Sequence, residues 1–226
     1  MTQDLETQLD RRFRMVNTPV DLERREVNIL HPANADDLIS EADFERDERL
    51  PYWADLWPSA KMLGRSLVEE NGKGRTLLEL GCGSGLVSVA AVIAGYDALA
   101  SDYYTDALLF TRLNVERNVA GGSVRTREID WRDLPKGLGR FDRVVAADVL
   151  YEPAHGDLVA RAIAKTLERD GRATVADPGR ISRQAFIDRA AELGLEVDLS
   201  RKAQFQEGEI RQEITLIDLQ WRIGRF

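Results

Sequence analysis

Three glycines and an acid in the middle of the chain could hold a nucleoside. Gly81, Gly83 and Gly85 directly follow the apolar residues 77–80, and Asp102 ends the next apolar run. Glycines allow sharp turns and a close approach of the backbone to a ligand. An acid at this spacing can accept hydrogen bonds from both hydroxyls of a ribose. The pattern therefore predicts a nucleotide-binding crossover unit of strand, glycine turn and helix.

The spacing favours a nucleoside without phosphates. The glycines read G-x-G-x-G, so the third glycine of the dinucleotide pattern G-x-G-x-x-G is missing, and a pyrophosphate at the start of the helix over residues 86–94 is disfavoured. Glu79, which we expect in the loop just before the first glycine, would repel phosphate and attract a cation. S-adenosylmethionine combines ribose, adenine, sulfonium and ammonium, and is the predicted cofactor. A nicotinamide dinucleotide is a distant alternative.

Length and composition predict one acidic domain over residues 1–226. The chain has 226 residues and is 43% hydrophobic, enough for a full core. Its net charge of -8 argues against nucleic acid as a partner, because proteins that bind nucleic acid usually present a basic face. A basic side chain as substrate is compatible with that charge.

The sequence predicts neither a metal site nor a membrane anchor. Cys82 is the only cysteine, so no intrachain disulfide or cysteine cluster can form, and its place between two glycines is best explained by a need for a small side chain. No apolar run approaches the roughly 18 residues of a membrane span, and the acidic residues 1–10 are unlike a targeting peptide. A cytoplasmic location is the expectation.

Strands and helices alternate from residue 75 onward. Extended runs are expected over residues 75–80, 97–101, 124–129, 143–147 and 173–176, with helices between them such as 105–119 and 157–169. Two further extended runs, 195–202 and 213–221, predict a C-terminal antiparallel hairpin. The predicted fold is a Rossmann-like α/β fold with a seven-stranded, mostly parallel sheet and helices on both faces.

Residues 1–50 are expected to form an accessory segment in front of a catalytic core over residues 51–226. The segment opens with an amphipathic stretch to about residue 14 and continues with extended pieces around Val20 and residues 27–30. An acidic helix is expected over residues 36–44, where Asp36 and Asp37 would form a solvated face.

Four patches beyond the glycine loop give the chain a specific resemblance. They are Pro51 to Ala60 (PYWADLWPSA), Asp130-Trp131, Asp148-Val149-Leu150-Tyr151 and Asp177-Pro178-Gly179-Arg180. With these in order, the chain resembles the class I, seven-β-strand methyltransferases that use S-adenosylmethionine. Within them it is most similar to the small protein-lysine methyltransferases of the electron-transfer-flavoprotein β-subunit type.

The resemblance implies further residues around the cofactor. Asp130 would accept from the adenine amino group, Trp131 would border the adenine, and Trp57 would pack over the cofactor. Ala147, at the end of the strand before Asp148, completes the predicted cofactor-binding set of Trp57, Glu79, Gly81, Gly83, Asp102, Asp130, Trp131 and Ala147. The alternatives are a helix cap at Asp130 and core positions for both tryptophans.

Asp148 and Tyr151 are the predicted catalytic residues. They follow the fourth strand at the carboxyl edge of the sheet, where ligands bind to open α/β sheets. Methyl transfer needs a deprotonated amine within attacking distance, so Asp148 would orient the amine by accepting a hydrogen bond and Tyr151 would wall the channel. The alternative is an Asp that caps the next helix, followed by a buried Tyr.

Two other residues are weaker site predictions. Pro178-Gly179 predicts a turn, and the resemblance places Arg180 on the substrate side, where it would touch a target protein. His155 could move a proton, but a lone histidine at the start of a helix is more often a solvated surface residue.

These observations predict an S-adenosylmethionine-dependent N-methyltransferase that acts on lysine in a protein. By resemblance, the β-subunit of electron transfer flavoprotein is the leading partner. One rival is a methyltransferase of the same fold acting on a small-molecule amine, which would enclose its substrate beneath residues 1–50. A second rival is a catalytically silent module that only binds the cofactor.

Overall fold

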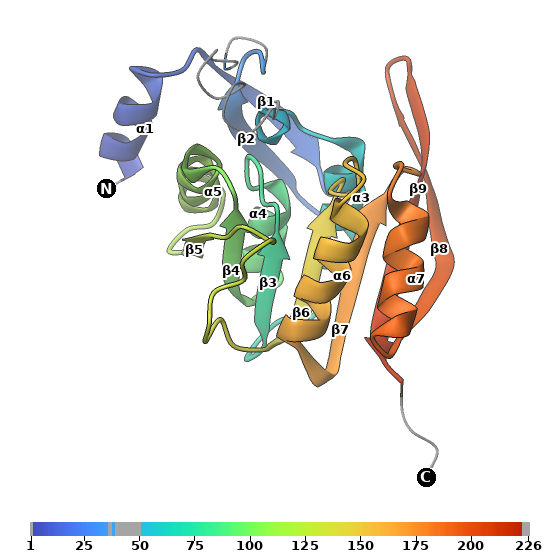
Figure 1. Ribbon diagram of the computed structural model, residues 1–226. Helices are drawn as coiled ribbons and strands as arrows, with labels where there is room; N and C mark the ends of the chain where they lie inside the picture. Colours follow the sequence, from blue (N-terminus) through green and yellow to red (C-terminus); the bar gives the residue numbers. More distant parts are fainter. Residues whose placement is uncertain (1, 36–37, 39–50, 223–226) are drawn as a thin grey trace.

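One mixed sheet with helices on both faces carries the fold (Figure 1). The computed structural model describes residues 2–35, 38 and 51–222. The acidic helix predicted over residues 36–44, with Asp36 and Asp37, therefore lies outside the described residues except for residue 38.

The sheet has parallel strands and one antiparallel edge. Its strands in chain order are β3 (Thr76–Leu80), β4 (Asp97–Asp102), β5 (Arg125–Glu128), β6 (Phe141–Ala147), β7 (Leu167–Asp177), β8 (Leu195–Glu207) and β9 (Ile210–Trp221). They lie side by side in the order β5-β4-β3-β6-β7-β9-β8. The first five are parallel, whereas β9 runs antiparallel to both β7 and β8. The predicted fold class is confirmed.

The terminal hairpin is longer than predicted. Pairing of β8 with β9 continues to Glu207 and Ile210, beyond the ends of the two predicted runs at residues 202 and 213. Residues 210–213 of β9 are all exposed, whereas the opposing end of β8 alternates, with Ala203 half-buried and Phe205 buried between exposed polar side chains. Backbone pairing therefore extends the ladder along β9 without a buried face on that strand.

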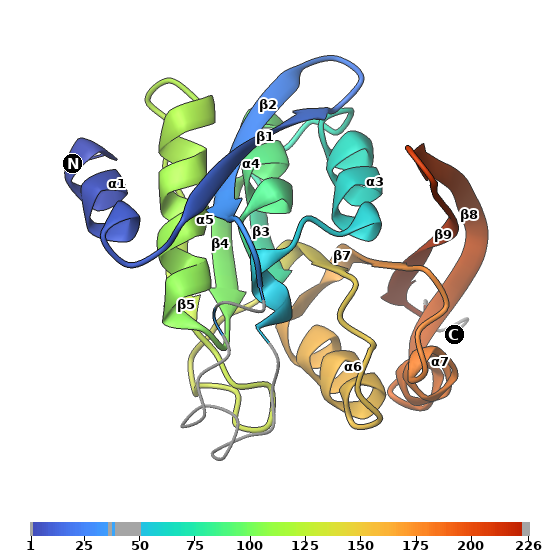
Figure 2. The same ribbon diagram turned by 90° about the horizontal axis from the view of Figure 1, so that it is seen from above.

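Helices cover the two faces of the sheet in separate groups. One group comprises α3 (Pro58–Leu67), α4 (Leu86–Ile93) and α5 (Thr105–Asn118), and the other comprises α6 (His155–Thr166) and α7 (Arg183–Glu192) (Figure 2). Leu78 and Leu80 of β3 pack with the core on the α6 and α7 side, and Leu77 packs with α3 and α4. The central strand is thus buried on both faces, as its three leucines predict, and Glu79 is buried with them.

The N-terminal segment packs on the first group of helices. It comprises α1 (Thr2–Asp10) and a two-stranded antiparallel sheet of β1 (Met15–Asp21) and β2 (Glu26–Pro32). The buried side chain of Asn114 on α5 accepts from the Leu30 amide at 2.8 Å and donates to the carbonyls of Leu30 and Ser84, each at 2.8 Å. One amide side chain therefore joins the accessory segment to the glycine loop.

The order of the strands opens a crevice at the carboxyl edge of the sheet. β3 lies between β4 and β6, so the chain builds outward on one side of β3 and then crosses to its other side. Loops that leave neighbouring strands toward opposite faces separate at such a point, which is where open α/β sheets bind ligands.

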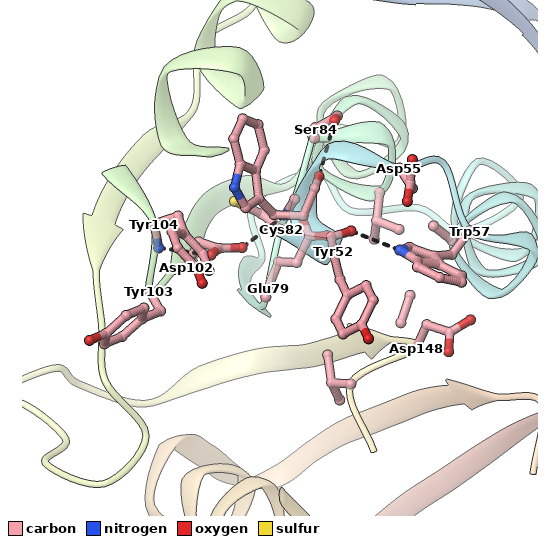
Figure 3. A pocket seen from close by; sticks show the side chains of 18 of the residues that line it. Tyr52, Asp55, Trp57, Glu79, Cys82, Ser84, Asp102, Tyr103, Tyr104 and Asp148 are labelled. Carbon is pink, nitrogen blue, oxygen red and sulfur yellow. Dashed lines mark hydrogen bonds between the residues drawn. The ribbon is translucent and has the colours of Figure 1, made fainter. Parts of the chain in front are cut away.

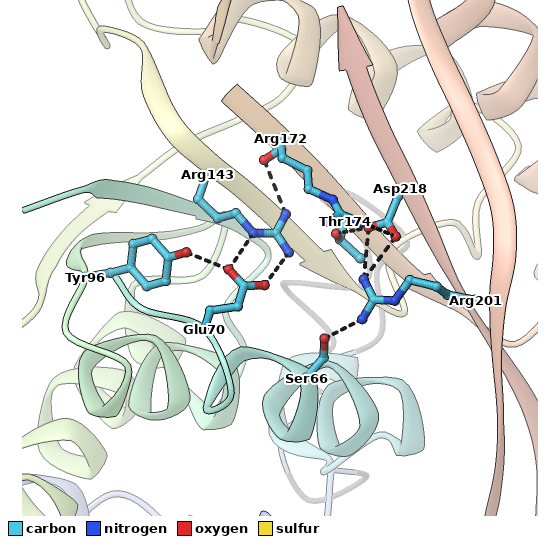
Figure 4. Close-up of polar contacts among 8 residues, drawn as sticks. All are labelled: Ser66, Glu70, Tyr96, Arg143, Arg172, Thr174, Arg201 and Asp218. Atoms are coloured by element: carbon cyan, nitrogen blue, oxygen red, sulfur yellow. Dashed lines mark hydrogen bonds and ion pairs between the residues drawn. The ribbon is translucent and has the colours of Figure 1, made fainter. Parts of the chain in front are cut away.

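A network of charged and polar side chains surrounds Arg143 of β6 and continues to Asp218 of β9 (Figure 4). The Arg143 guanidinium of β6, with 2% of its side chain exposed, donates to the Glu70 carboxylate at 2.9 Å and 3.1 Å. Tyr96 donates to the same carboxylate at 2.5 Å. Burial acts to raise the pKa of Glu70, but the hydrogen bonds and charge of Arg143 outweigh it, so the pKa is lowered.

We expect Glu70→Gln to lower the free energy of unfolding by about 3 kcal/mol, because it leaves the buried Arg143 charge without its anion. Chemical denaturation followed by circular dichroism measures the change. Glu69→Gln is the matched control, since Glu69 pairs with Arg24 at the surface and such pairs contribute less than about 1 kcal/mol. Equal losses in both variants would contradict a structural role for the Glu70–Arg143 pair.

Candidate active site

A pocket at the carboxyl edge of the sheet collects every predicted cofactor-binding and catalytic residue. It is lined by Trp57, Glu79, Gly81, Gly83, Asp102, Asp130, Trp131, Ala147, Asp148 and Tyr151, among others. In Figure 3, Asp102 and the two tyrosines that follow it lie on one side, Asp148 and Trp57 lie on the other, and Glu79 and Cys82 lie between them. Residues from β3, β4 and β6 thus meet in one cavity.

The loop between β3 and α4 requires glycine at two positions for different reasons. A Cβ at Gly83, where φ is +51°, would lie 3.0 Å from the carbonyl oxygen of Trp53. A Cβ at Gly85, where φ is +88°, would lie 2.6 Å from the Thr111 backbone on α5. Gly83 lets the loop lie against the Tyr52–Ala54 turn, and Gly85 lets α4 start close to α5.

Asp102 is tied to the glycine loop by its carboxylate. One oxygen accepts from the Gly83 amide at 3.0 Å, and the other accepts from the Tyr104 amide at 3.0 Å. Burial raises the pKa of Asp102, and the backbone hydrogen bonds oppose this rise. A carboxylate oxygen has two lone-pair sites, so each oxygen keeps capacity for a ligand hydroxyl.

Glu79 lies in β3 and not in a loop, so the sequence analysis was wrong about its position. Its side chain points into the protein, 1% of the residue is exposed, and the hydroxyl of Ser88 donates to it. Burial, helped by the nearby Asp102 charge, raises the pKa of Glu79 to about 8. At neutral pH the carboxyl therefore holds its proton for most of the time, and a cation bound nearby would favour its ionised form.

Asp130 and Trp131 follow β5 at the far side of the pocket. The Asp130 carboxylate pairs with Arg132, whose Nη2 lies 2.6 Å from Oδ2, in a turn where no helix begins. The helix-cap alternative for Asp130 is therefore wrong. The buried indole N–H of Trp131 has no hydrogen-bond partner among the described residues. An unpaired buried donor is rare and costly, so a ligand acceptor would satisfy it.

Asp148 follows β6 directly and is held by contacts to β7 and α3. Its amide donates to the Ala176 carbonyl at 2.9 Å, the hydroxyl of Ser59 on α3 donates to Oδ2 at 2.8 Å, and the residue has φ of +59°. The next helix, α6, begins seven residues later at His155. The alternative in which Asp148 caps that helix is therefore wrong.

Arg180 contacts Asp148, a pairing that the sequence analysis did not predict. The Arg180 Nε lies 2.6 Å from Asp148 Oδ1, and its guanidinium lies 5.1 Å from the centre of the Trp57 ring. The buried Asp177 carboxylate shapes the loop by accepting from the amides of Gly179, at 2.7 Å, and Arg180, at 3.3 Å. The turn predicted at Pro178-Gly179 is confirmed.

Aromatic rings line the side of the pocket that contains Asp148. The ring of Tyr151 lies 5.2 Å from that of Tyr52 and 4.9 Å from that of His155. His155 is buried, and its Nδ1 lies 2.7 Å from the Val149 carbonyl oxygen. The expectation of a solvated surface histidine is wrong, because the chain between β6 and α6 folds back over the ring.

The remaining sequence expectations concern thiols, metals and membranes. Cys82 is buried and burial raises the pKa of its thiol, which agrees with a packing role. No cluster of potential metal ligands occurs in the part of the chain that the structure describes. Within those same residues, no helix has the length and apolar character needed to cross a bilayer.

Comparison with known proteins identifies relatives of the catalytic core. The lysine methyltransferase family matches residues 44–189, well over half of the chain. The electron transfer flavoprotein beta subunit lysine methyltransferase of Xenopus laevis is 29% identical over 137 residues, 58% of this chain and 53% of that protein. The Mus musculus protein of the same name is 31% identical, with coverage of 58% and 51%. The chain spans about half the length of these relatives.

Solved structures share the fold at low sequence identity. A TehB-like SAM-dependent methyltransferase from Corynebacterium glutamicum aligns with a TM-score of 0.55 at 17% identity, covering 80% of this chain and 94% of that one. Magnesium protoporphyrin IX methyltransferase from Synechocystis, with bound SAM, aligns with a TM-score of 0.57 at 18% identity, covering 81% and 94%.

We expect Glu79 to make the protein less stable as the pH rises from about 4.5 to about 8. The folded state holds the Glu79 proton over this window and the unfolded state releases it, so this group lowers the unfolding free energy by about 1.4 kcal/mol per pH unit. Denaturant titrations from pH 4.5 to 8.5 measure the slope. Glu79→Gln should remove this component, and an unchanged slope in the variant would contradict the assignment.

Proposed function

The chain belongs to the lysine methyltransferase family, and we propose that it transfers a methyl group from S-adenosylmethionine to a lysine amine of a protein. One observation carries the proposal. The residues suited to a nucleoside and those suited to an amine line two sides of the same pocket. Cofactor and acceptor could thus meet without a domain movement.

The residues on the β3 and β4 side fit the cofactor. The Asp102 carboxylate has spare acceptor capacity for ribose hydroxyls, and Glu79 can offer a negative charge to a cationic group once it loses its proton. The unpaired Trp131 indole N–H would donate to an acceptor on the adenine. Asp130 stays a predicted adenine contact, which its carboxylate would make while it remains paired with Arg132.

The residues on the β6 side would receive the acceptor amine. S-adenosylmethionine supplies an electrophilic methyl group whose C–S bond breaks, with its electron pair left on sulfur, as the amine lone pair forms the new N–C bond. Asp148 would accept a hydrogen bond from the amine and aim its lone pair. Tyr151, against Tyr52 and His155, would confine the lysine side chain.

The surroundings of the pocket favour a protein over a small molecule as substrate. Ile181, next to Arg180, is 76% exposed, and Tyr52 is 37% exposed. Apolar side chains at the rim of a site can contact the surface of a macromolecule. The described part of residues 1–50 packs on α5 and on the α3 and α4 core, and none of these described residues lines the pocket. Two relatives are named for the β-subunit of electron transfer flavoprotein, which is therefore the first partner to test.

We expect the protein to bind S-adenosylmethionine, or its demethylated product, far more tightly than NAD. Isothermal titration calorimetry compares the two. Asp102→Ala should weaken binding of the methyl donor by about 1.5–3 kcal/mol, because hydrogen bonds to a charged group are lost. Asp106→Ala is the control, since that acid pairs with Arg12 on the surface of α5. Tighter binding of NAD would contradict the proposed cofactor.

We expect the protein to transfer tritium from labelled S-adenosylmethionine to lysine of purified electron transfer flavoprotein β-subunit. Asp148→Asn should lower turnover by about a hundredfold and keep most of the cofactor affinity, because one positioned polar group is lost. Asp188→Asn, an exposed acid on α7, is the control. Mass spectrometry identifies the modified residue. Label on a small molecule of a cell lysate, with none on protein, would favour the small-molecule rival.

A further inference from the structure

The proposed role of Asp148 raises an electrostatic difficulty. A lysine amine has an unperturbed pKa of about 10.4, so it arrives as an ammonium without a free lone pair. A carboxylate within about 4–6 Å favours the charged form of the amine and raises its pKa further. An unpaired Asp148 anion would therefore orient the acceptor and also hold it in its unreactive form.

The structure places a second charge on this carboxylate. The Arg180 Nε lies 2.6 Å from Asp148 Oδ1, and the Asp148 side chain is 2% exposed. Ser59 donates to the other oxygen at 2.8 Å. Each oxygen thus accepts one hydrogen bond and keeps a lone-pair site for an incoming amine.

Arg180 is held in place by contacts other than its ion pair with Asp148. Its guanidinium lies 5.1 Å from the centre of the Trp57 ring, and the indole N–H of Trp57 donates to the Tyr52 carbonyl at 2.9 Å. Its backbone is held by the buried Asp177 carboxylate, which accepts from the Gly179 and Arg180 amides. The cation is therefore fixed by two independent contacts apart from the ion pair.

We propose that Arg180 is a positioning residue that cancels the charge of Asp148, so that the pocket takes the acceptor amine in its neutral, nucleophilic form. This inference rests on the proposed function and adds the device that selects the protonation state. Asp148 then acts as an oriented hydrogen-bond acceptor and not as a counter-ion. A fixed guanidinium beside the amine also disfavours a second positive charge there.

The other basic side chains near the pocket pair with carboxylates other than Asp148. From β7 and α7, Asp177 and Arg183 face each other at 3.7 Å and offset one another. From α3, Lys61 pairs with Glu207 of β8. The remaining titratable groups that line the pocket are Tyr52 and Asp55 before α3, Glu79 on β3, Cys82 in the glycine loop, Asp102 on β4, Tyr103 and Tyr104 after it, Asp130 after β5, and Tyr151 and His155 at α6. Among the ion pairs of the described residues, only the one with Arg180 involves Asp148.

The first test is the dependence of methyl transfer on pH, with electron transfer flavoprotein β-subunit as acceptor. We expect Arg180→Gln to move the rising limb of the pH profile of kcat upward by about 1–3 pH units, because kcat reports groups in the substrate complex and an uncompensated Asp148 raises the pKa of the bound acceptor. Activity near neutral pH should fall about 10- to 1,000-fold and recover at high pH. Arg180→Lys should keep the limb near its wild-type position.

The matched control is Arg183→Gln, which removes a cation from the same region without removing a contact to Asp148. The rising limb of the pH profile of this variant should stay at its wild-type position. A parallel loss at every pH in Arg180→Gln would show that Arg180 only supports the loop and would overturn the proposal. A lower KM with an unmoved limb would show that Arg180 obstructs the amine, which also overturns it.

The second test needs no acceptor. Carbon-13 NMR of the aspartate carboxyls, with Asp148→Asn to assign the signal, reports the surroundings of the Asp148 carboxylate in the full chain at neutral pH. Arg180→Gln should shift this signal, since the carboxylate loses its hydrogen-bonded cation, whereas Arg183→Gln should leave it in place. An unchanged signal in Arg180→Gln would overturn the proposal even in an active enzyme. A wild-type protein that transfers no methyl group would contradict the proposed function, whereas this comparison would still decide the pairing.

Discussion

The parallel pairing of β3 with β4 on one side and β6 on the other is the constraint on which the site depends. It aligns the carboxyl ends of three strands, so that Glu79, Asp102 and Asp148 border one pocket although they are far apart in the chain. The same alignment lets the amides of Gly81 and Cys82 donate to the Ser101 carbonyl, each at 2.9 Å. The glycine loop is therefore anchored on β4 before any ligand is bound.

The two sides of the pocket differ in whether their carboxylates form ion pairs with a basic side chain. On the side that we propose for the cofactor, neither Glu79 nor Asp102 forms an ion pair within the described residues, and burial raises the pKa of both. Such acids are suited to a cationic ligand, because ionisation becomes favourable when the ligand arrives. On the acceptor side, Asp148 pairs with Arg180. A balanced pair is suited to a neutral amine, which is the species that methyl transfer requires.

Much of the fold follows from patterns between near neighbours in the sequence. The apolar run over residues 77–80, the three glycines and the acid at Asp102 predicted the central crossover unit, and the structure confirms the strand, the turn and the helix. The motif Asp148 to Tyr151 was placed correctly after β6, because a buried strand and the turn that ends it are both local signals. The full length of the β8–β9 hairpin was missed, since residues 210–213 of β9 are all exposed and give that strand no apolar face there.

The sequence by itself determined which residue types could bind a nucleoside and an amine, and in what order along the chain they occur. Only the tertiary structure decided their charges and partners. Arg180 and Asp148 are 32 residues apart and meet because β6 and β7 pair in parallel, with Ala147 beside Ala176. Glu79 holds a proton because packing on both faces of β3 excludes water from its carboxyl. The ion pair and the protonated carboxyl both arise from burial and strand register. These depend on contacts between distant segments, so the spacing of neighbouring residues does not predict them.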